Sequence, residues 1–344
     1  MPEPEIPADR GLSPVVRVAP AKLNLTLAVT GRTATGFHTL HTVMVPLGLA
    51  DRVSIARAHG PTDTLAVNGL DAGPHGANLV VRAIAAARKA LRGQVDAWPV
   101  AARLHKDIPV AAGLGGGSSD AAAALDAVLL AWGADVAVDA PVLAGIRAEL
   151  AASLGSDVPF FLADGPAIVT GRGEVVEKLP ALRGSPPGLL LVTPRIPAPT
   201  PAVFRAFDED PEARPLDSGS TRLASEHLAG EWRAGMRAAA LVTRAGVLAS
   251  ANDLAAAADV VVPGLRSLRR ALVRRLARPV GLSGSGPTLW VLYASNDEAA
   301  SAAEAVSAGV ADGSIVAPGA LQPSIIATAL ATAAGDHLGE ERTE

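Results

Sequence analysis

The chain has no cysteine among its 344 residues, and only 3% of its residues are aromatic. The first absence excludes disulfides, thiolate metal sites and cysteine nucleophiles. The second means that the hydrophobic core must consist mainly of Ala, Val, Leu and Ile, and the apolar fraction of 49% supplies them. The net charge of −4 provides no basic field for nucleic acid, so we expect no nucleic-acid partner.

Long hydrophobic runs are also missing. No apolar stretch reaches the roughly 18–20 residues that a membrane-spanning helix needs, so we expect no membrane partner. The first twelve residues mix Pro, Glu, Asp and Arg without an apolar segment, which is unlike a secretory signal. We therefore predict a cytoplasmic protein whose residues 1–13 form a loose tail.

Strand-like and helix-like segments intermingle without a regular βαβα alternation, which favours an α+β fold. The apolar patterns predict strands over residues 15–18, 23–29, 38–47, 51–56, 100–105, 167–170, 174–178, 188–193 and 288–293. They predict helices over residues 78–91, 118–132, 140–154, 203–207, 230–249, 254–277 and 296–310. Gly, Ser and Pro at 183–188 mark the best boundary. We predict domains over residues 14–183 and 188–335, followed by a charged tail over 336–344.

The most informative motif is the glycine loop, residues 109–119. It holds four glycines within five positions and ends in two serines, just before an Ala-rich helix pattern that either serine could cap. Bare N–H groups at the positive end of a helix dipole form an anion site. The loop lacks both the Walker lysine and the third glycine of a dinucleotide fingerprint. We predict a site for nucleotide phosphates, with a linker or capping turn as the alternative.

The order Pro-x3-Gly-Leu-Gly-Gly-Gly-Ser-Ser in this loop resembles the phosphate loop of the GHMP kinases. Other segments add to the resemblance: residues 20–25, 36–40, 78–79, 154–161, 199–201 and the second glycine loop at 284–286. Together they resemble the branch that phosphorylates the 2-hydroxyl of a cytidine diphosphate-linked methylerythritol in non-mevalonate isoprenoid synthesis. The resemblance covers about residues 15–295. It implies a two-domain α+β kinase with its active site in the cleft between the domains.

The resemblance also implies ATP and Mg²⁺ as cofactors and assigns roles to residues. Asp157 matches the catalytic carboxylate and Lys22 its cationic partner, whereas taken alone they would be a turn residue and a solvated lysine. Asn78 and Lys106 match positions near the adenine. The residues expected to hold the ATP phosphates are Pro109, Val110, Ala111, Ala112, Gly113, Leu114, Gly115, Gly116, Gly117, Ser118 and Ser119. Either serine could also reach Mg²⁺, and no further metal ligand is identified.

Phe37 and His38 match the segment that holds the cytosine, by ring stacking and by a hydrogen bond. The branch usually has tyrosine at position 37, so any contact through a phenol is lost here. Asn24 lies two residues after Lys22, on the same face of a strand, where it can form a hydrogen bond to the substrate. Three residues are thus expected to complete the substrate pocket: Asn24, Thr200 and Pro201.

Two other functions stay open from the sequence. One is another small-molecule kinase of the family, such as a homoserine or mevalonate kinase, against which the Phe37-His38 pair argues. The other is a nucleotide-binding protein without catalysis, which would need neither Lys22 nor Asp157. The Asn-Asp-Leu segment at 252–254 is expected to cap a helix and not to bind a ligand. The oligomeric state is not determined by the sequence.

Overall fold

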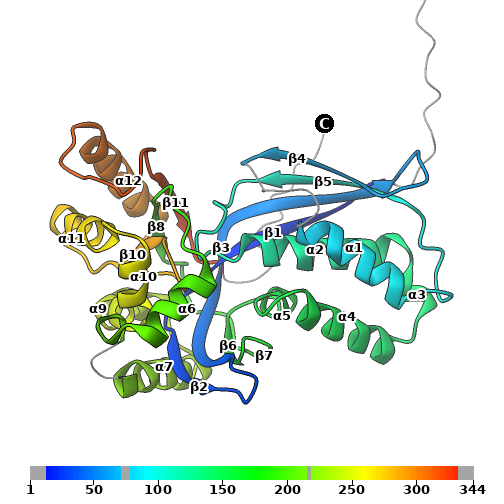
Figure 1. Ribbon diagram of the computed structural model, residues 1–344, viewed down its shortest axis with the longest axis horizontal. Helices are drawn as coiled ribbons and strands as arrows, with labels where there is room; N and C mark the ends of the chain where they lie inside the picture. Colours follow the sequence, from blue (N-terminus) through cyan, green and yellow to red (C-terminus); the bar gives the residue numbers. More distant parts are fainter. Residues whose placement is uncertain (1–12, 71–77, 215–217, 332–344) are drawn as a thin grey trace, which may run out of the picture.

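The computed structural model describes residues 13–70, 78–214 and 218–331. Apart from Ser13, both predicted tails lie outside these residues. Two β-sheets organise the described chain, each with helices packed on it (Figure 1). This mixed arrangement confirms the predicted α+β fold class.

The first sheet has seven strands in the order β4-β5-β3-β6-β7, and β1 and β2 also pair with the long β3. All these pairs are antiparallel except that between β4 and β5. The strands are β1 Val15–Asn24, β2 Ala28–Arg32, β3 His38–Arg57, β4 Thr64–Gly69, β5 Val100–Lys106, β6 Ala167–Gly171 and β7 Val175–Lys178. The helices beside this sheet are α1 Leu79–Ala90, α2 Gly116–Ala131, α3 Ala134–Ala137, α4 Ala140–Leu154 and α5 Val158–Leu162 (Figure 1).

The second sheet has four strands in the order β11-β8-β10-β9. They are β8 Gly188–Thr193, β9 Gly281–Leu282, β10 Leu289–Tyr293 and β11 Ser324–Ala329. The helices of this part are α6 Thr200–Glu209, α7 Ser218–Arg233, α8 Ala238–Thr243, α9 Ala245–Ser250, α10 Ala255–Val261, α11 Leu265–Leu276 and α12 Asn296–Ala311, with a 3₁₀ turn at Pro211–Ala213. The chain passes from one sheet to the other between β7 and β8, where the boundary was expected, and the domain limits themselves stay a prediction.

Small and branched apolar residues build the core, as the shortage of aromatics requires. Helix α2 buries almost all of its alanines between the first sheet and its neighbouring helices. A separate cluster joins the two sheets, with Leu23 and Val45 from one and Leu191 and Trp290 from the other. The two halves of the molecule therefore share an apolar contact, and this fixes how their loops face each other.

Several predicted boundaries were wrong. The break expected at Pro20 is absent, because β1 continues through it with a register shift between Pro20 and Lys22. Such a bulge tolerates the missing N–H of proline. The two strands expected over 38–47 and 51–56 are one continuous strand, β3.

The long helices predicted at 230–249 and 254–277 are each divided. Gly235 and Gly264 lie at the divisions with φ of 90° and 93°, a conformation that ends or starts helices and favours glycine. Strands β4 and β11 and most of α7 were not predicted, since their short or mixed patterns resemble loops.

Candidate active site

A cavity of about 400 Å³ lies between the two halves of the molecule. The lining includes the glycine loop, residues from β1 and β3, and Asp157, which directly precedes α5. Helix α6 and the second glycine loop, between β9 and β10, complete it. Both predicted glycine loops therefore reach one cavity, although 170 residues separate them in sequence at Gly113 and Ser283.

The second glycine loop holds the first in place. The Ser283 hydroxyl donates to the Gly113 carbonyl at 3.0 Å, and the Thr288 N–H donates to the Ala112 carbonyl at 3.2 Å. Gly113 has φ of 79°, and a Cβ there would lie 2.4 Å from the Ser283 carbonyl oxygen. Only glycine allows this close approach of the two backbones. In the sequence, the second loop only added to the family resemblance, and its contact with the first loop was not predicted.

The predicted serine cap of α2 was wrong. The helix starts at Gly116 and its N-cap is Gly115, whose φ of 71° is accessible to glycine at little cost. The helix therefore begins earlier, so its first N–H groups lie within the glycine loop itself. The structure also separates the two serines: Ser118 lines the cavity, whereas Ser119 is buried on the side of a second cavity of about 590 Å³.

Lys22 and Asp157 lie beside each other in the lining of the cavity. The Lys22 ammonium lies 3.8 Å from the Asp157 carboxylate, and the side chains are 5% and 35% exposed. Burial lowers the pKa of Lys22 from its ordinary value, and the charge and hydrogen bonding of Asp157 oppose that shift. A buried cation thus lies beside a carboxylate that remains open to a ligand.

Asn24 shares this cluster, as the two-residue spacing on a strand predicts. Lys22 Nζ donates to Asn24 Oδ1 at 2.6 Å, and Asn24 Nδ2 donates to the Thr42 hydroxyl at 2.9 Å. The backbone of Gly284 closes over the pair, since a Cβ there would lie 3.1 Å from Asn24 Oδ1 and 3.2 Å from Lys22 Nζ. The second half of the chain therefore contributes directly to the centre of the site.

The cytosine candidates occupy different environments. Phe37 is 59% exposed and is not among the residues that line the cavity, and the guanidinium of Arg172 lies 5.5 Å from its ring. His38 packs against α6, with its ring stacked 4.5 Å from that of Phe204, and its Nε2 lies 2.8 Å from Asp208 Oδ1. Phe204 lines the cavity, whereas His38 is outside the lining and contacts it through the Phe204 ring.

Some of the other predicted residues line the cavity and others do not. Thr200 lines the cavity and its hydroxyl lies 3.0 Å from that of Ser285, whereas Pro201 and Leu114 are outside the lining. Asn78 and Lys106 both line the cavity. The other predicted residues in the lining are Lys22, Asn24, Asp157, Pro109, Val110, Ala111, Ala112, Gly113, Gly115, Gly116, Gly117 and Ser118.

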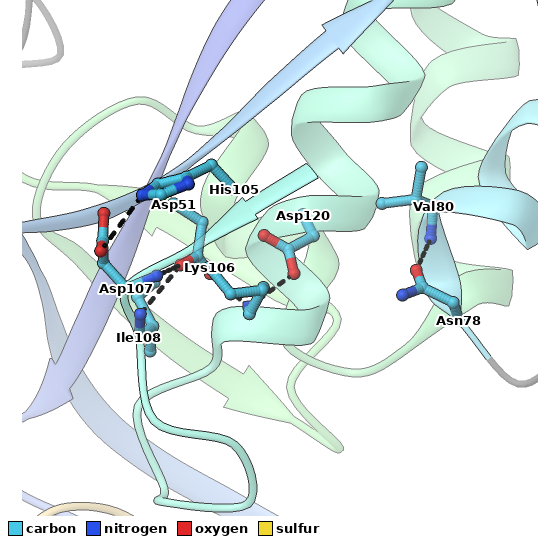
Figure 2. Close-up of polar contacts among 8 residues, drawn as sticks. All are labelled: Asp51, Asn78, Val80, His105, Lys106, Asp107, Ile108 and Asp120. Atoms are coloured by element: carbon cyan, nitrogen blue, oxygen red, sulfur yellow. Dashed lines mark hydrogen bonds and ion pairs between the residues drawn. The ribbon is translucent and has the colours of Figure 1, made fainter. Parts of the chain in front are cut away.

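Asn78 and Lys106 already have intramolecular partners (Figure 2). Asn78 Oδ1 accepts from the Val80 N–H at 2.9 Å and caps α1. The Lys106 ammonium pairs with Asp51 and with Asp120, which lies 2.7 Å away. The Asn78 side-chain oxygen and the Lys106 ammonium are thus engaged within the protein, and Lys106 is only 2% exposed.

The sequence assigned no site role to Thr42 and Phe204, which line the cavity, and it used Gly284 and Ser285 only as part of the second glycine loop. Phe204 lies one helical turn after Thr200 and could have been found from that spacing. Thr42 had no signal, because only the pairing of β3 with β1 places it opposite this cluster. Asn252 forms the expected turn before α10, accepting from the Leu254 N–H, and its amide also donates to the Gly284 carbonyl.

Within the described residues, no group of three or more His, Asp or Glu side chains is placed to hold a metal ion. Among the described helices, none has the length and apolar character that a membrane crossing requires.

Two family models match this chain. The GHMP kinases N-terminal domain matches residues 78–165, and the GHMP kinases C-terminal model matches residues 235–312. The 4-diphosphocytidyl-2-C-methyl-D-erythritol kinase of Rhizobium meliloti is 36% identical over 300 residues, which are 85% of this chain and 90% of that one. The enzyme of the same name from Pelotomaculum thermopropionicum is 37% identical over 285 residues, 83% of this chain and 91% of that one. This chain belongs to the GHMP kinase family.

Solved structures agree with this assignment. A crystal structure of 4-(cytidine 5'-diphospho)-2C-methyl-D-erythritol kinase superposes on this GHMP kinase with a TM-score of 0.64 at 32% identity, covering 92% of this chain and 99% of the other. A homoserine kinase from Cytophaga hutchinsonii gives a TM-score of 0.65 at 17% identity, over 94% and 96% of the two chains. The second likeness shows the shared fold alone. This GHMP kinase is therefore an ATP-dependent enzyme.

Proposed function

We propose that this enzyme transfers the γ-phosphoryl group of ATP to the 2-hydroxyl of 4-diphosphocytidyl-2-C-methyl-D-erythritol, in the non-mevalonate route to isoprenoids. The observation that carries the proposal is the cluster of Lys22, Asn24 and Asp157 beside the glycine loop, in one cavity. The relatives with this activity are about one third identical over most of the chain. A cytoplasmic location stays a prediction from the sequence.

In the proposed chemical step, Asp157 acts on the substrate hydroxyl and Lys22 acts on the charge of the phosphoryl group. The substrate hydroxyl attacks the γ-phosphorus, an O–P bond forms, the bond to the β-phosphate oxygen breaks, and ADP leaves. Asp157 orients the hydroxyl and accepts its proton, for which its partly exposed carboxylate is available. Lys22 places a positive charge beside the reacting phosphoryl group and beside the ionised Asp157. Because it is buried, its charge is poorly screened by solvent.

The glycine loop and the start of α2 supply the anion site. Backbone N–H groups from Gly113 to Ser118 lie at the positive end of a 16-residue helix and suit the ATP phosphates. Mg²⁺ prefers oxygen ligands, and phosphates and water supply many of them, so a site with few protein carboxylates suits it. The Ser118 hydroxyl on the cavity wall is the proposed protein oxygen. Bound Mg²⁺ would neutralise charge on the phosphates.

The cytosine is proposed to bind where the β2–β3 hairpin meets α6. Phe37 has an exposed ring face for stacking, and Phe204 presents a second ring at the cavity. His38 and Asn24 offer hydrogen-bonding groups, and Thr200 and Pro201 begin the helix that carries Phe204. The missing phenol at position 37 leaves the stacking itself intact. Base–ring stacking is worth about 1–3 kcal/mol in nucleic-acid complexes.

The test uses purified protein with ATP, Mg²⁺ and one acceptor at a time. We expect ADP release with the diphosphocytidyl acceptor and none with homoserine or mevalonate. Turnover with homoserine or mevalonate instead would reassign the enzyme within the family. Bound nucleotide without turnover on any acceptor would support a non-catalytic protein.

A further inference from the structure

Three buried charges lie at the foot of the glycine loop and have no part in the mechanism described above (Figure 2). They are Asp51 from β3, Lys106 from the end of β5 and Asp120 from α2, with exposures of 1%, 2% and 3%. The Lys106 ammonium contacts both carboxylates. Such a buried group of charges is costly to form, so an apolar cluster of similar volume would often be as stable. Stability alone therefore does not explain this cluster of charges, and positioning of the glycine loop is the other role that it can have.

Asp51 holds the entrance of the loop. Its Oδ1 accepts from the N–H of Asp107 at 2.6 Å and from the N–H of Ile108 at 2.9 Å, and its Oδ2 accepts from Lys106 Nζ (Figure 2). One carboxylate thus fixes the two residues that carry the chain from β5 into the loop. Hydrogen bonds to a buried charged group are among the stronger ones in proteins.

Asp120 and Gly116 bring the exit of the loop to the same point. Asp120 is in the first turns of α2, and its Oδ2 accepts from Lys106 Nζ at 2.7 Å. A Cβ on Gly116, the first residue of α2, would lie 3.2 Å from Lys106 Nζ, so the ammonium packs against the helix start. A cation there opposes the helix dipole, and the two carboxylates offset it.

We propose that Asp51 is a positioning residue for the nucleotide site. Through Lys106 and Asp120 it holds the entrance and the exit of the glycine loop together, so that the N–H groups between them are preorganised for phosphate. The inference rests on the proposed kinase function. It assigns Lys106 an effect on nucleotide affinity that acts through the loop.

The charge of this group also depends on pH. Burial raises the pKa of Asp120 to about 7, with Asp51 adding to the shift and Lys106 opposing it. Within the described chain, the Asp120 Oδ1 atom has no hydrogen-bond partner. Asp120 is ionised above this pKa and neutral below it. Its ion pair with Lys106, which holds the exit of the loop, therefore weakens as the pH falls from 8 to 6.

The experiment compares Asp51→Asn with Asp126→Asn in the full-length enzyme. Asp126 is in the same helix, where it pairs with Arg147 at the surface. Asp51→Asn removes the charge that holds Lys106 and the loop entrance. We expect its KM for ATP to rise by about tenfold or more, while kcat and the KM for the acceptor change by less than about threefold. Asp126→Asn should match the wild type in all three constants.

The pH profile supplies a second test. In the wild type and in Asp126→Asn, the KM for ATP should rise as the pH decreases from 8 to 6, because the Lys106–Asp120 ion pair is lost. Asp120→Asn should flatten that dependence, since an amide does not titrate. The titration of ATP itself is common to all variants and cancels in the comparison.

Three results would overturn the inference: an unchanged KM for ATP in Asp51→Asn, an equal rise in both KM values, or an unchanged KM for ATP in Asp120→Asn at pH 8. If Asp51→Asn does not fold, the KM values of Asp120→Asn, which loosens the loop exit, provide the test. Fluorescent ADP titrated into each protein measures nucleotide affinity without turnover. Weakened ADP binding in Asp51→Asn would therefore support the inference even if no acceptor is phosphorylated.

Discussion

The two walls of the cavity are built in different ways. The nucleotide wall is one continuous stretch, from Lys106 to Asp120, whose shape is set by glycine backbone and by buried polar contacts. The acceptor wall is assembled from side chains on β1, β3 and α6, and the cytosine candidate Phe37 lies outside the cavity lining and is mostly exposed. The first wall is held by hydrogen bonds and ion pairs within the protein, while the second depends on side chains from three separate elements.

This difference predicts how variants should behave. Changes at the reacting centre, where the walls meet, should reduce kcat. Changes in the nucleotide wall should act on ATP, and changes in the acceptor wall should act on the acceptor. A variant that alters both KM values equally would show that the walls are not independent.

The largest effect is expected at Asp157. Asp157→Asn should lower kcat by about 10²–10⁴-fold, because the amide does not accept the proton of the attacking hydroxyl, while nucleotide affinity stays within about twofold. Steady-state kinetics and ADP titration measure the two quantities. Asp164→Asn, an exposed aspartate just after α5, is the matched control and should behave as the wild type. Turnover near the wild-type level in Asp157→Asn would remove this residue from the mechanism.

The next largest effect is expected at Lys22. Lys22→Met should lower kcat by about 10²-fold, since a buried charge near the phosphoryl group is lost. In the wild type the ammonium is charged below its pKa, and burial lowers that pKa from 10.5. Activity should therefore decline with rising pH at a lower pH than an ordinary lysine would cause.

The control for Lys22 is Lys178→Met, which alters an exposed lysine on β7 and should keep full activity. A pH profile of Lys22→Met that still shows the alkaline decline would assign that decline to another group.

A smaller effect is expected where the two glycine loops meet. Gly113→Ala introduces a Cβ 2.4 Å from the Ser283 carbonyl oxygen and should lower the free energy of unfolding by about 1–3 kcal/mol and weaken ATP binding. Gly133→Ala has a similar φ of 68° and no atom within 4 Å of the added Cβ, so it isolates the cost of the backbone conformation. Denaturant unfolding and the KM for ATP measure the difference. Equal results for the two variants would show that the loops do not depend on this contact.

The smallest effect is expected at Phe37. Phe37→Ala should raise the KM for the diphosphocytidyl acceptor by about fivefold to tenfold, through lost stacking, and leave the KM for ATP unchanged. Phe37→Tyr adds the phenol that the family resemblance leads us to expect at this position and should equal or improve on the wild type. A change confined to ATP affinity would place the cytosine elsewhere.

The sequence predicted a large part of the fold where a pattern was local. The span of α4, the hairpin of β6 and β7, and strands β8 and β10 follow from periodicity and turn residues. It failed where distant pairing decides the outcome. Strand β11 forms because β8 offers it an edge, and β1 passes Pro20 because the register against β3 shifts there.

The candidate site shows the same division. The glycine loop was evident, because its glycines, its serines and the start of the following helix are consecutive in the sequence. The sequence did not reveal which serine faces the cavity, nor that Thr42 and Gly284 adjoin Lys22 and Asn24. These relations depend on strand register and on contact between the two halves of the molecule.

The sequence by itself determined the core of small aliphatic residues and the glycine loop, and its resemblance to the GHMP kinases predicted a lysine and an aspartate for phosphoryl transfer. Only the tertiary structure decided how these parts act together. It set the second glycine loop against the first, buried Lys22 beside Asp157, and linked the two ends of the glycine loop through Asp51, Lys106 and Asp120. The reason is physical: a local motif fixes backbone conformation and side-chain type, whereas burial and distance between remote residues arise only when the two sheets pack.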